Sequence, residues 1–230
     1  MSIRDYERPS LTTDMVLFRV HDGESLNRRR YAKKELQVLL IKRENEPQEG
    51  MWSLPGGFVE IDEEIYANVR RKLSYKAGVE GDFYVEQLYT WGALNRDSRG
   101  RVISVSYMGL CNEETLIQND VDRELMWVNV FDVLSGEFGE LAFDHKSIIA
   151  YALERLQNKI EYTDIAFNLL PSEFTIRECQ TVYELVLGRE INNFRRKIGQ
   201  YVEPTDKILE GMQFNPAKLY KMKTDRTSKF

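Results

Sequence analysis

The amino-acid sequence predicts an α/β protein followed by a smaller, mainly helical part, and three observations lead to this prediction. The first half holds short apolar runs of strand length, and residues 102–111 alternate between two kinds of side chain, as a sheet with two unlike faces requires. One clear helical pattern, at residues 62–76, interrupts these runs. From residue 144 onward, helical patterns dominate.

The strands of the first half are predicted from runs that are rich in apolar residues and bounded by polar loops. These runs cover residues 15–20, 36–41, 83–91, 102–111 and 125–130. The segment between the first two runs is strongly basic, and we interpret it as a solvated loop. Its basic residues are Arg28, Arg29, Arg30, Lys33 and Lys34.

The helix predicted at residues 62–76 carries its own start and stop signals. Asp62 is a suitable N-terminal cap, and the two glutamates after it suit the positive end of a helix. Gly78 is a suitable stop. One apolar stripe repeats every fourth residue and should be buried: Ile65, Val69 and Leu73.

The second half is predicted to consist of three helices and a pair of strands. The first helix, at residues 144–159, is strongly amphipathic, and we place the domain boundary near it, so that it bridges two parts. Helices at residues 175–187 and 190–200 follow, separated by Gly188. The last predicted elements are two strands that pair with each other, at residues 201–205 and 217–222. The expected parts are 1–142, 143–162 and 163–230.

Composition limits the classes of function. The 230 residues, 42% of them hydrophobic, suffice for one large domain or two small ones. No apolar run approaches the roughly 20 residues that a membrane span needs, so no membrane partner is expected. The only cysteines, Cys111 and Cys179, lie far apart, which argues against a disulfide framework or a zinc site and favours a cytoplasmic location.

Charge is distributed unevenly along the chain. Residues 1–150 hold 19 basic against 26 acidic side chains, whereas the residues from Arg189 onward hold 10 basic and 5 acidic ones. An acidic body with a basic C-terminal end suggests a nucleic-acid partner.

The helix predicted at residues 190–200 carries side chains that could read DNA bases. Its apolar residues cluster on one side: Ile191, Phe194 and Ile198. The opposite side carries Asn192, Asn193, Arg196 and Gln200, and the flanks carry Arg195 and Lys197. Arginine can bind guanine with two hydrogen bonds, asparagine or glutamine can bind adenine in the same way, and flanking cations suit phosphates. The alternative is an amphipathic helix with a solvated polar face.

Residues 56–79, GGFVEIDEEIYANVRRKLSYKAGV, resemble the Nudix box. That motif is a glycine, five residues, a glutamate, seven residues, and then Arg-Glu-aliphatic-x-Glu-Glu-x-Gly-aliphatic. The matching residues are Gly57, Glu63, Arg71, Leu73, Gly78 and Val79, and the preceding WSLPG at residues 52–56 also resembles the family. The resemblance implies a Nudix-like α/β/α sandwich around a mixed sheet.

The departures from the box bear on function. The helix glutamates that hold divalent metal in active Nudix hydrolases are replaced by Lys72, Tyr75 and Lys76. Magnesium requires oxygen ligands, which two ammonium groups and a phenol do not supply. We therefore predict no catalytic residues, no metal, no other cofactor and no enzymatic activity. The alternative is a Nudix hydrolase, an ADP-ribose or sugar-nucleotide pyrophosphatase with displaced metal ligands.

Several residues are candidates for binding a ligand in this domain. Lys72 and Lys76 share one helix face and could replace the metal as counter-charge for phosphates, although a solvated lysine pair is the simpler interpretation. Residues 95–101 resemble Nudix proteins that handle ADP-ribose; Arg99 and Arg101 in this segment could bind phosphates or could belong to a charged hairpin turn. Further candidates are Arg43, Trp52 and Phe58, of which Trp52 is equally suited to the core.

Residues 141–223 resemble the C-terminal half of the Nudix-related transcriptional regulators (NrtR-like proteins), which is a winged helix-turn-helix domain. The resembling segments are LAFDH (141–145), YALERL (151–156), KIEYT (159–163), LPSEFT (170–175), YE (183–184) and NFRRK (193–197). This resemblance implies that 1–142 is a ligand-sensing domain, 143–162 a connecting helix and 163–230 the DNA-binding domain.

The same resemblance implies a function and partners. It implies a homodimeric, cytoplasmic repressor that binds a palindromic operator in double-stranded DNA. The implied effector is ADP-ribose or a sugar phosphate. The remaining alternative is a protein-binding module whose C-terminal helices only dimerise.

Overall fold

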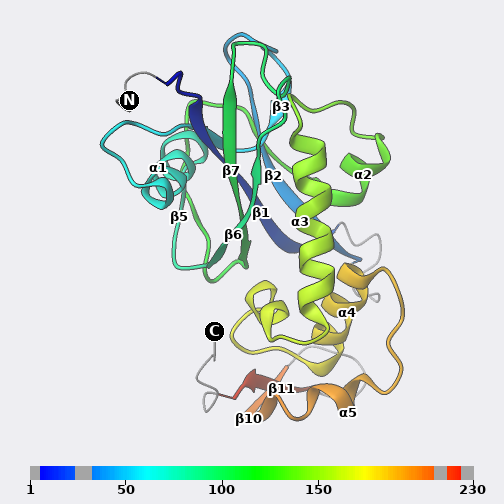
Figure 1. Ribbon diagram of the computed structural model, residues 1–230. Coiled ribbons are helices and arrows are strands. Elements are labelled where there is room, and N and C mark those ends of the chain that lie inside the picture. The colour runs from blue at the N-terminus through cyan, green and yellow to red at the C-terminus, as the bar shows by residue number, and fades with distance from the viewer. Residues whose placement is uncertain (1–5, 24–32, 210–216, 224–230) are drawn as a thin grey trace.

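The computed structural model describes residues 6–23, 33–209 and 217–223 of the chain (Figure 1). Its centre is a mixed sheet with the strand order β3-β2-β1-β7-β6, to which β4 and β9 are added beside β1 and β2. The long strands β1 (Ser10–Asp22) and β7 (Val102–Cys111) are parallel, and the other pairs are antiparallel. The remaining strands of the sheet are β2 (Lys34–Lys42), β3 (Trp52–Ser53), β4 (Gly56–Phe58), β6 (Tyr84–Trp91) and β9 (Leu125–Asn129).

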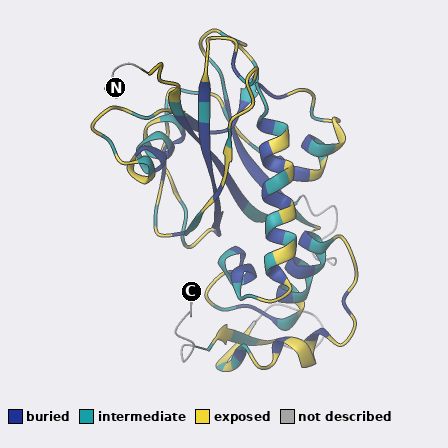
Figure 2. Ribbon diagram, in the orientation of Figure 1, coloured by how far each residue is buried: buried dark blue, intermediate teal, exposed yellow. Residues whose placement is uncertain are grey.

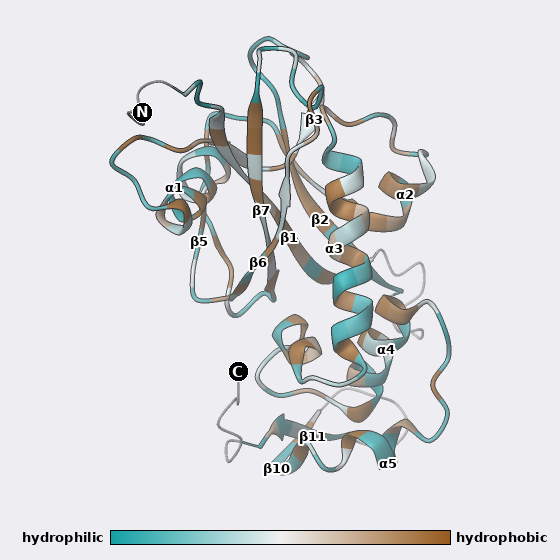
Figure 3. Ribbon diagram, in the orientation of Figure 1, coloured by the Kyte–Doolittle hydropathy of each residue, from teal (hydrophilic) through white to brown (hydrophobic). Residues whose placement is uncertain are grey.

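Helices cover both faces of the sheet, which confirms the predicted α/β/α sandwich (Figure 1). Alternate residues of a strand point to opposite faces. Met15 and Leu17 of β1 therefore pack with α1 (Ile65–Ala77), whereas Val16 and Phe18 pack on the side of α2 (Val130–Ser135) and α3 (His145–Ile160). The brown strands of Figure 3 show how apolar the sheet between these layers is. A small separate sheet pairs β5 (Val79–Glu80) with β8 (Ile117–Gln118).

The helix predicted at residues 62–76 is α1, but the predicted start is three residues too early. The helix begins at Ile65, and the capping position is occupied by Glu64 and not by Asp62. The physical reason is Glu63, whose carboxylate accepts hydrogen bonds from the backbone N–H of Glu60 and from Asn68, and so holds these residues in a turn. The end was predicted correctly, since Gly78 closes the helix at a positive φ of 64°.

The C-terminal part is built on the far half of α3. It contains a 3₁₀ turn, η2 (Ile165–Leu169), then α4 (Ile176–Leu187), α5 (Phe194–Ile198) and the antiparallel pair β10 (Val202–Leu209) and β11 (Ala217–Met222). One apolar core runs from the sheet along α3 into α4 and α5. Figure 2 shows the buried side of α3 extending along both parts, which makes this helix their common support.

The helix predicted at residues 190–200 is shortened to Phe194–Ile198, which corrects the prediction at both ends. Asn193 adopts a left-handed conformation with φ 57°, which a helix interior does not allow. Side chains of α4 hold the preceding turn: Glu184 accepts a hydrogen bond from the Ile191 N–H at 2.8 Å, and Gln180 donates one to the Ile191 carbonyl at 3.2 Å. The predicted pairing of the last two strands is confirmed.

Among the described residues, no helix combines the length and the apolar character that crossing a bilayer requires.

Candidate functional site

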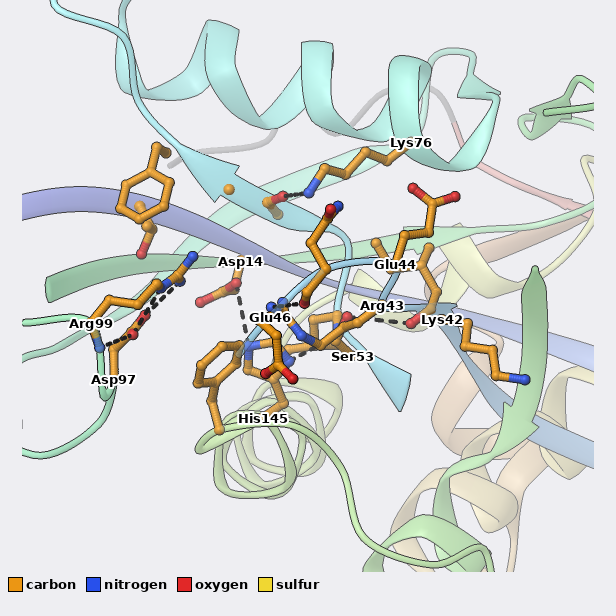
Figure 4. Close-up of a pocket in the computed structure, with 18 of the residues that line it drawn as sticks. Asp14, Lys42, Arg43, Glu44, Glu46, Ser53, Lys76, Asp97, Arg99 and His145 are labelled. Carbon is orange, nitrogen blue, oxygen red and sulfur yellow. Dashed lines mark hydrogen bonds and ion pairs between the residues drawn. The ribbon is translucent and has the colours of Figure 1, made fainter. Parts of the chain in front are cut away.

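A pocket of about 200 Å³ opens where the loop before α1, the ends of β1 and β2, the β6–β7 hairpin and the start of α3 meet (Figure 4). Its walls are strongly charged, with six cationic side chains against four carboxylates. The cations are Lys42, Arg43, Lys76, Arg96, Arg99 and Arg123. The carboxylates are Asp14, Glu44, Glu46 and Asp97.

The structure brings four of the predicted ligand residues together in this pocket. They are Arg43, Phe58, Lys76 and Arg99. The other three do not line it. Trp52 is half-buried and packs on Phe138, with 6.2 Å between ring centroids, at the edge of the core. The stem of Lys72 covers Gly57, and Arg101 donates hydrogen bonds to the carbonyls of Gly92 and Ala93 within its own hairpin.

Lys76 is the one residue of the three substituted box positions that reaches into the pocket. Its ammonium group donates a hydrogen bond of 2.8 Å to the carbonyl oxygen of Gly56 in the box loop. Burial, reinforced by nearby cations, lowers the pKa of Lys76 to about 8. Tyr75 is instead exposed, with the guanidinium of Arg123 over its ring. A positive charge thus lies at the box loop, where a metal-dependent relative needs acidic ligands.

The remaining box carboxylate, Glu63, is occupied by structural contacts. It accepts two hydrogen bonds from Arg71, of 2.6 and 2.7 Å, and one from Asn68. The bond from Arg71 is the main reason why the pKa of Glu63 falls to about 2. Within the described part of the chain, no three Asp, Glu, His or Cys side chains cluster in a way that could hold a metal ion. The residues present therefore do not fit the magnesium site of the box.

Arginines and aromatic rings alternate along one wall of the pocket. The guanidinium of Arg99 lies 4.9 Å from the ring centroid of Phe58 and 5.7 Å from that of Phe143. The guanidinium of Arg43 lies 4.7 Å from the centroid of Phe143. Phe143 is held there in a left-handed conformation, φ 53°, and its N–H donates to the side chain of Gln48. This wall offers flat surfaces for a planar ring beside cations for an anion.

A buried polar cluster forms part of the pocket lining and includes the first residue of α3. Arg96 binds Asp144 through two hydrogen bonds, of 2.9 and 2.7 Å, and lies 3.5 Å from Asp14. His145 accepts a hydrogen bond at Nδ1 from the Leu54 N–H, and its Nε2 lies 3.5 Å from Asp14. Burial lowers the pKa of His145, so the imidazole is neutral at pH 7. Asp14, Arg96, Phe143 and His145 were not predicted as site residues.

Four of the six pocket cations already have carboxylate partners. Arg96 pairs with Asp144, Arg99 with Asp97, Arg123 with Glu44, and Lys42 with Glu124. In the described residues, the side-chain hydrogen bonds of Lys76 and Arg43 go instead to carbonyl oxygens, that of Gly56 and those of Asn45 and Pro47. Because a carbonyl neutralises no charge, these two side chains suit the phosphates of a ligand.

The predicted DNA-contacting residues form an exposed polar surface on and around α5. The apolar side predicted from the sequence is buried: Ile191, Phe194 and Ile198. The side chains predicted to contact DNA, on the outward side and on the flanks, are all exposed: Asn192, Asn193, Arg195, Arg196, Lys197 and Gln200. In the chain, α4 precedes α5 and the β10–β11 pair follows it. This order of elements matches a helix-turn-helix with a wing.

Comparisons with known proteins agree with both parts. Residues 29–152 match the NUDIX domain, and residues 166–222 match the NrtR DNA-binding winged helix domain. The ADPR responsive transcriptional repressor NtrR of Acinetobacter baylyi is 37% identical over 227 residues, which cover 94% of this chain and 83% of that protein.

Two solved structures of Shewanella oneidensis NrtR are also similar. The structure of this protein in complex with a 27mer DNA has a TM-score of 0.77 and 37% identity, covering 93% of each chain. The structure of its NUDIX domain in complex with ADP ribose has a TM-score of 0.55 and 36% identity, covering 68% of this chain and 94% of that one. The chain therefore belongs to the NrtR family of Nudix-related transcriptional regulators.

Proposed function

We propose that this chain is a cytoplasmic, DNA-binding transcriptional repressor that responds to ADP-ribose or a related sugar-phosphate ligand. One observation carries the proposal. The helix α3 connects a cationic pocket at its start to the part of the chain that holds the exposed basic helix α5 and the β10–β11 wing. The Acinetobacter relative is named for a response to ADPR, and the Shewanella relative was crystallised with DNA and, as its NUDIX domain, with ADP ribose.

The pocket recognises its ligand without hydrolysing it. Hydrolysis of a diphosphate by a Nudix enzyme depends on metal-assisted attack by water, and the metal needs carboxylate ligands. Lys76 instead places an ammonium group 2.8 Å from the Gly56 carbonyl, and Glu63 is engaged by Arg71 and Asn68. A fixed cation can hold the phosphates but cannot activate a water molecule as a metal does.

The division of labour follows the chain. Residues 1–142 bind the ligand together with Phe143 and His145, which begin the connecting segment 143–162, and residues 163–230 bind DNA. The repressor acts as a homodimer on a palindromic operator, because two-fold symmetry in the protein matches two-fold symmetry in the duplex. Ligand binding changes the spacing of the two DNA-binding helices of the dimer. This requires that the ligand binds more tightly to the dimer with one spacing than to the dimer with the other. The contacts of Asp144 and His145 with pocket residues place the start of α3 where a ligand could bias it.

Selection from random duplexes, with and without ADP-ribose, tests this function. We expect a preferred palindromic sequence whose affinity changes when ADP-ribose is added, and no turnover of ADP-ribose with magnesium. Turnover at an ordinary enzymatic rate, about 1 per second or more, would instead establish the hydrolase. Absence of any sequence preference would support a module that only dimerises.

Replacing Lys76 by alanine is expected to weaken ADP-ribose binding about tenfold or more, because hydrogen bonds to charged groups contribute about 1.5–3 kcal/mol. The Lys72→Ala variant is the matched control on the same helix, since Lys72 does not line the pocket. It should lose less affinity for ADP-ribose than the Lys76→Ala variant. Calorimetry measures both.

Wild-type affinity for ADP-ribose should also fall as the pH rises through the Lys76 pKa of about 8, because the phosphates bind the protonated ammonium. Unchanged affinity in a variant that carries both substitutions would contradict the assignment.

A further inference from the structure

A second groove lies in the C-terminal part, between the first turns of α4, the helix α5 and the strand β11. Its volume is about 700 Å³, and it is separate from the ligand pocket. The residues that line it include Arg177, Gln180, Glu184, Arg195, Lys218 and Tyr220. Three of these residues are basic and one is acidic. The acidic residue, Glu184, already accepts hydrogen bonds from Gln180 and from the Ile191 backbone.

The basic residues of the C-terminal part differ in whether a carboxylate of the protein already neutralises their charge. Lys207 binds Glu173 at 2.9 Å, Lys221 binds Glu203 at 3.2 Å, and Arg189 binds Glu161. These three charges are balanced on the protein itself. Arg195 and Lys218 are exposed and have no carboxylate partner within the described residues. Two charges that no described carboxylate balances, those of Arg195 and Lys218, thus belong to side chains that line one groove.

Tyr220 fixes the position of Arg195. Its hydroxyl oxygen accepts a hydrogen bond of 3.3 Å from the Arg195 guanidinium. Its backbone exchanges two hydrogen bonds, of 2.9 and 2.8 Å, with Phe174 just before α4, so β11 is attached to the start of that helix. Lys218 and Tyr220 are two residues apart on β11 and therefore share one face of the strand, whereas Lys221 lies on the other face.

We propose that this groove binds a phosphate of the DNA backbone, with Arg195 and Lys218 as the charges and Tyr220 as a positioning residue that holds Arg195. The inference rests on the proposed DNA-binding function and deepens it. It assigns Arg195 to the DNA backbone and leaves base reading to residues such as Arg196, on the exposed side of α5. Phosphate contacts carry no sequence information, so this groove should act equally on every duplex.

The salt dependence of DNA binding tests the proposal in the full-length protein, on the preferred duplex and on a duplex of unrelated sequence. The logarithm of the association constant falls linearly with the logarithm of the salt concentration. Removing one phosphate-binding cation should make this slope less steep by about 0.9. We expect this reduction for Lys218→Ala on both duplexes, with the preference between them retained. Lys221→Ala is the matched control on the same strand and should leave the slope unchanged. Equal slopes for the two lysine variants would overturn the proposal.

A double-mutant cycle tests Tyr220 separately. Tyr220→Phe removes only the hydroxyl and should weaken DNA binding in the wild-type background. In an Arg195→Ala background, the same change should have no further effect, because the group that it positions is gone. Equal decreases in affinity in both backgrounds would overturn the positioning role. A wild-type protein that binds neither duplex would be a different result, since it would refute the proposed function itself.

Discussion

Replacing Arg96 by methionine is expected to lower the free energy of unfolding by about 3–5 kcal/mol, which is the usual cost of removing one partner from a buried ion pair. The side chain of Arg96 is only 5% exposed and lies between two carboxylates, Asp144 at 2.7 Å and Asp14 at 3.5 Å. Without the guanidinium, both carboxylates stay in a largely buried site and lose their ion-pair partner. Urea unfolding followed by circular dichroism measures the decrease.

The Arg101→Met variant is the matched control for Arg96. Arg101 belongs to the same hairpin, but its contacts are with the exposed backbone carbonyls of Gly92 and Ala93. Surface substitutions of this kind change stability by about 0.5 kcal/mol or less. A destabilisation by Arg96→Met no larger than that by Arg101→Met would show that Asp14 and Asp144 do not depend on the buried arginine.

What the sequence predicted well was local in character. The apolar stripe of α1, the stops at Gly78 and Gly188 and the inward side of α5 each follow from residues a few positions apart. The Nudix box predicted the sandwich in the same way, since its glycines and glutamate lie within one loop and helix. Lys76 was found because it departs from a motif, which is a signal that a single sequence can carry.

What the sequence did not show depends on distant residues or on unusual backbone conformations. The buried polar cluster of the pocket joins Asp14 to Arg96 and to His145, and no local pattern relates positions so far apart. Residues 95–101 drew attention to Arg99 and Arg101, but the buried arginine of this segment is Arg96. Phe143 enters the pocket through a left-handed conformation that its residue type does not predict. The predicted helix around α5 was too long because hydrogen bonds from α4 hold its first residues in a turn.

Replacing Arg196 by alanine is expected to weaken binding to the preferred duplex by about 1–3 kcal/mol, which corresponds to the removal of one base-reading arginine. Arg196 lies on the exposed side of α5, opposite the buried Phe194 and Ile198. Arginine in this position can donate two hydrogen bonds to a guanine in the major groove. The effect should be smaller on a duplex of unrelated sequence, so the variant should bind DNA with reduced discrimination. Fluorescence anisotropy with both duplexes measures the two affinities.

Arg189→Ala provides the matched control for Arg196, because Arg189 is also a basic residue near α5 but is paired with Glu161. It should leave the ratio of the two affinities unchanged. ADP-ribose binding should be the same in both variants, since neither residue lines the ligand pocket. Equal weakening on both duplexes would make Arg196 a phosphate-binding residue like Arg195. No weakening on either duplex would remove Arg196 from the DNA interface.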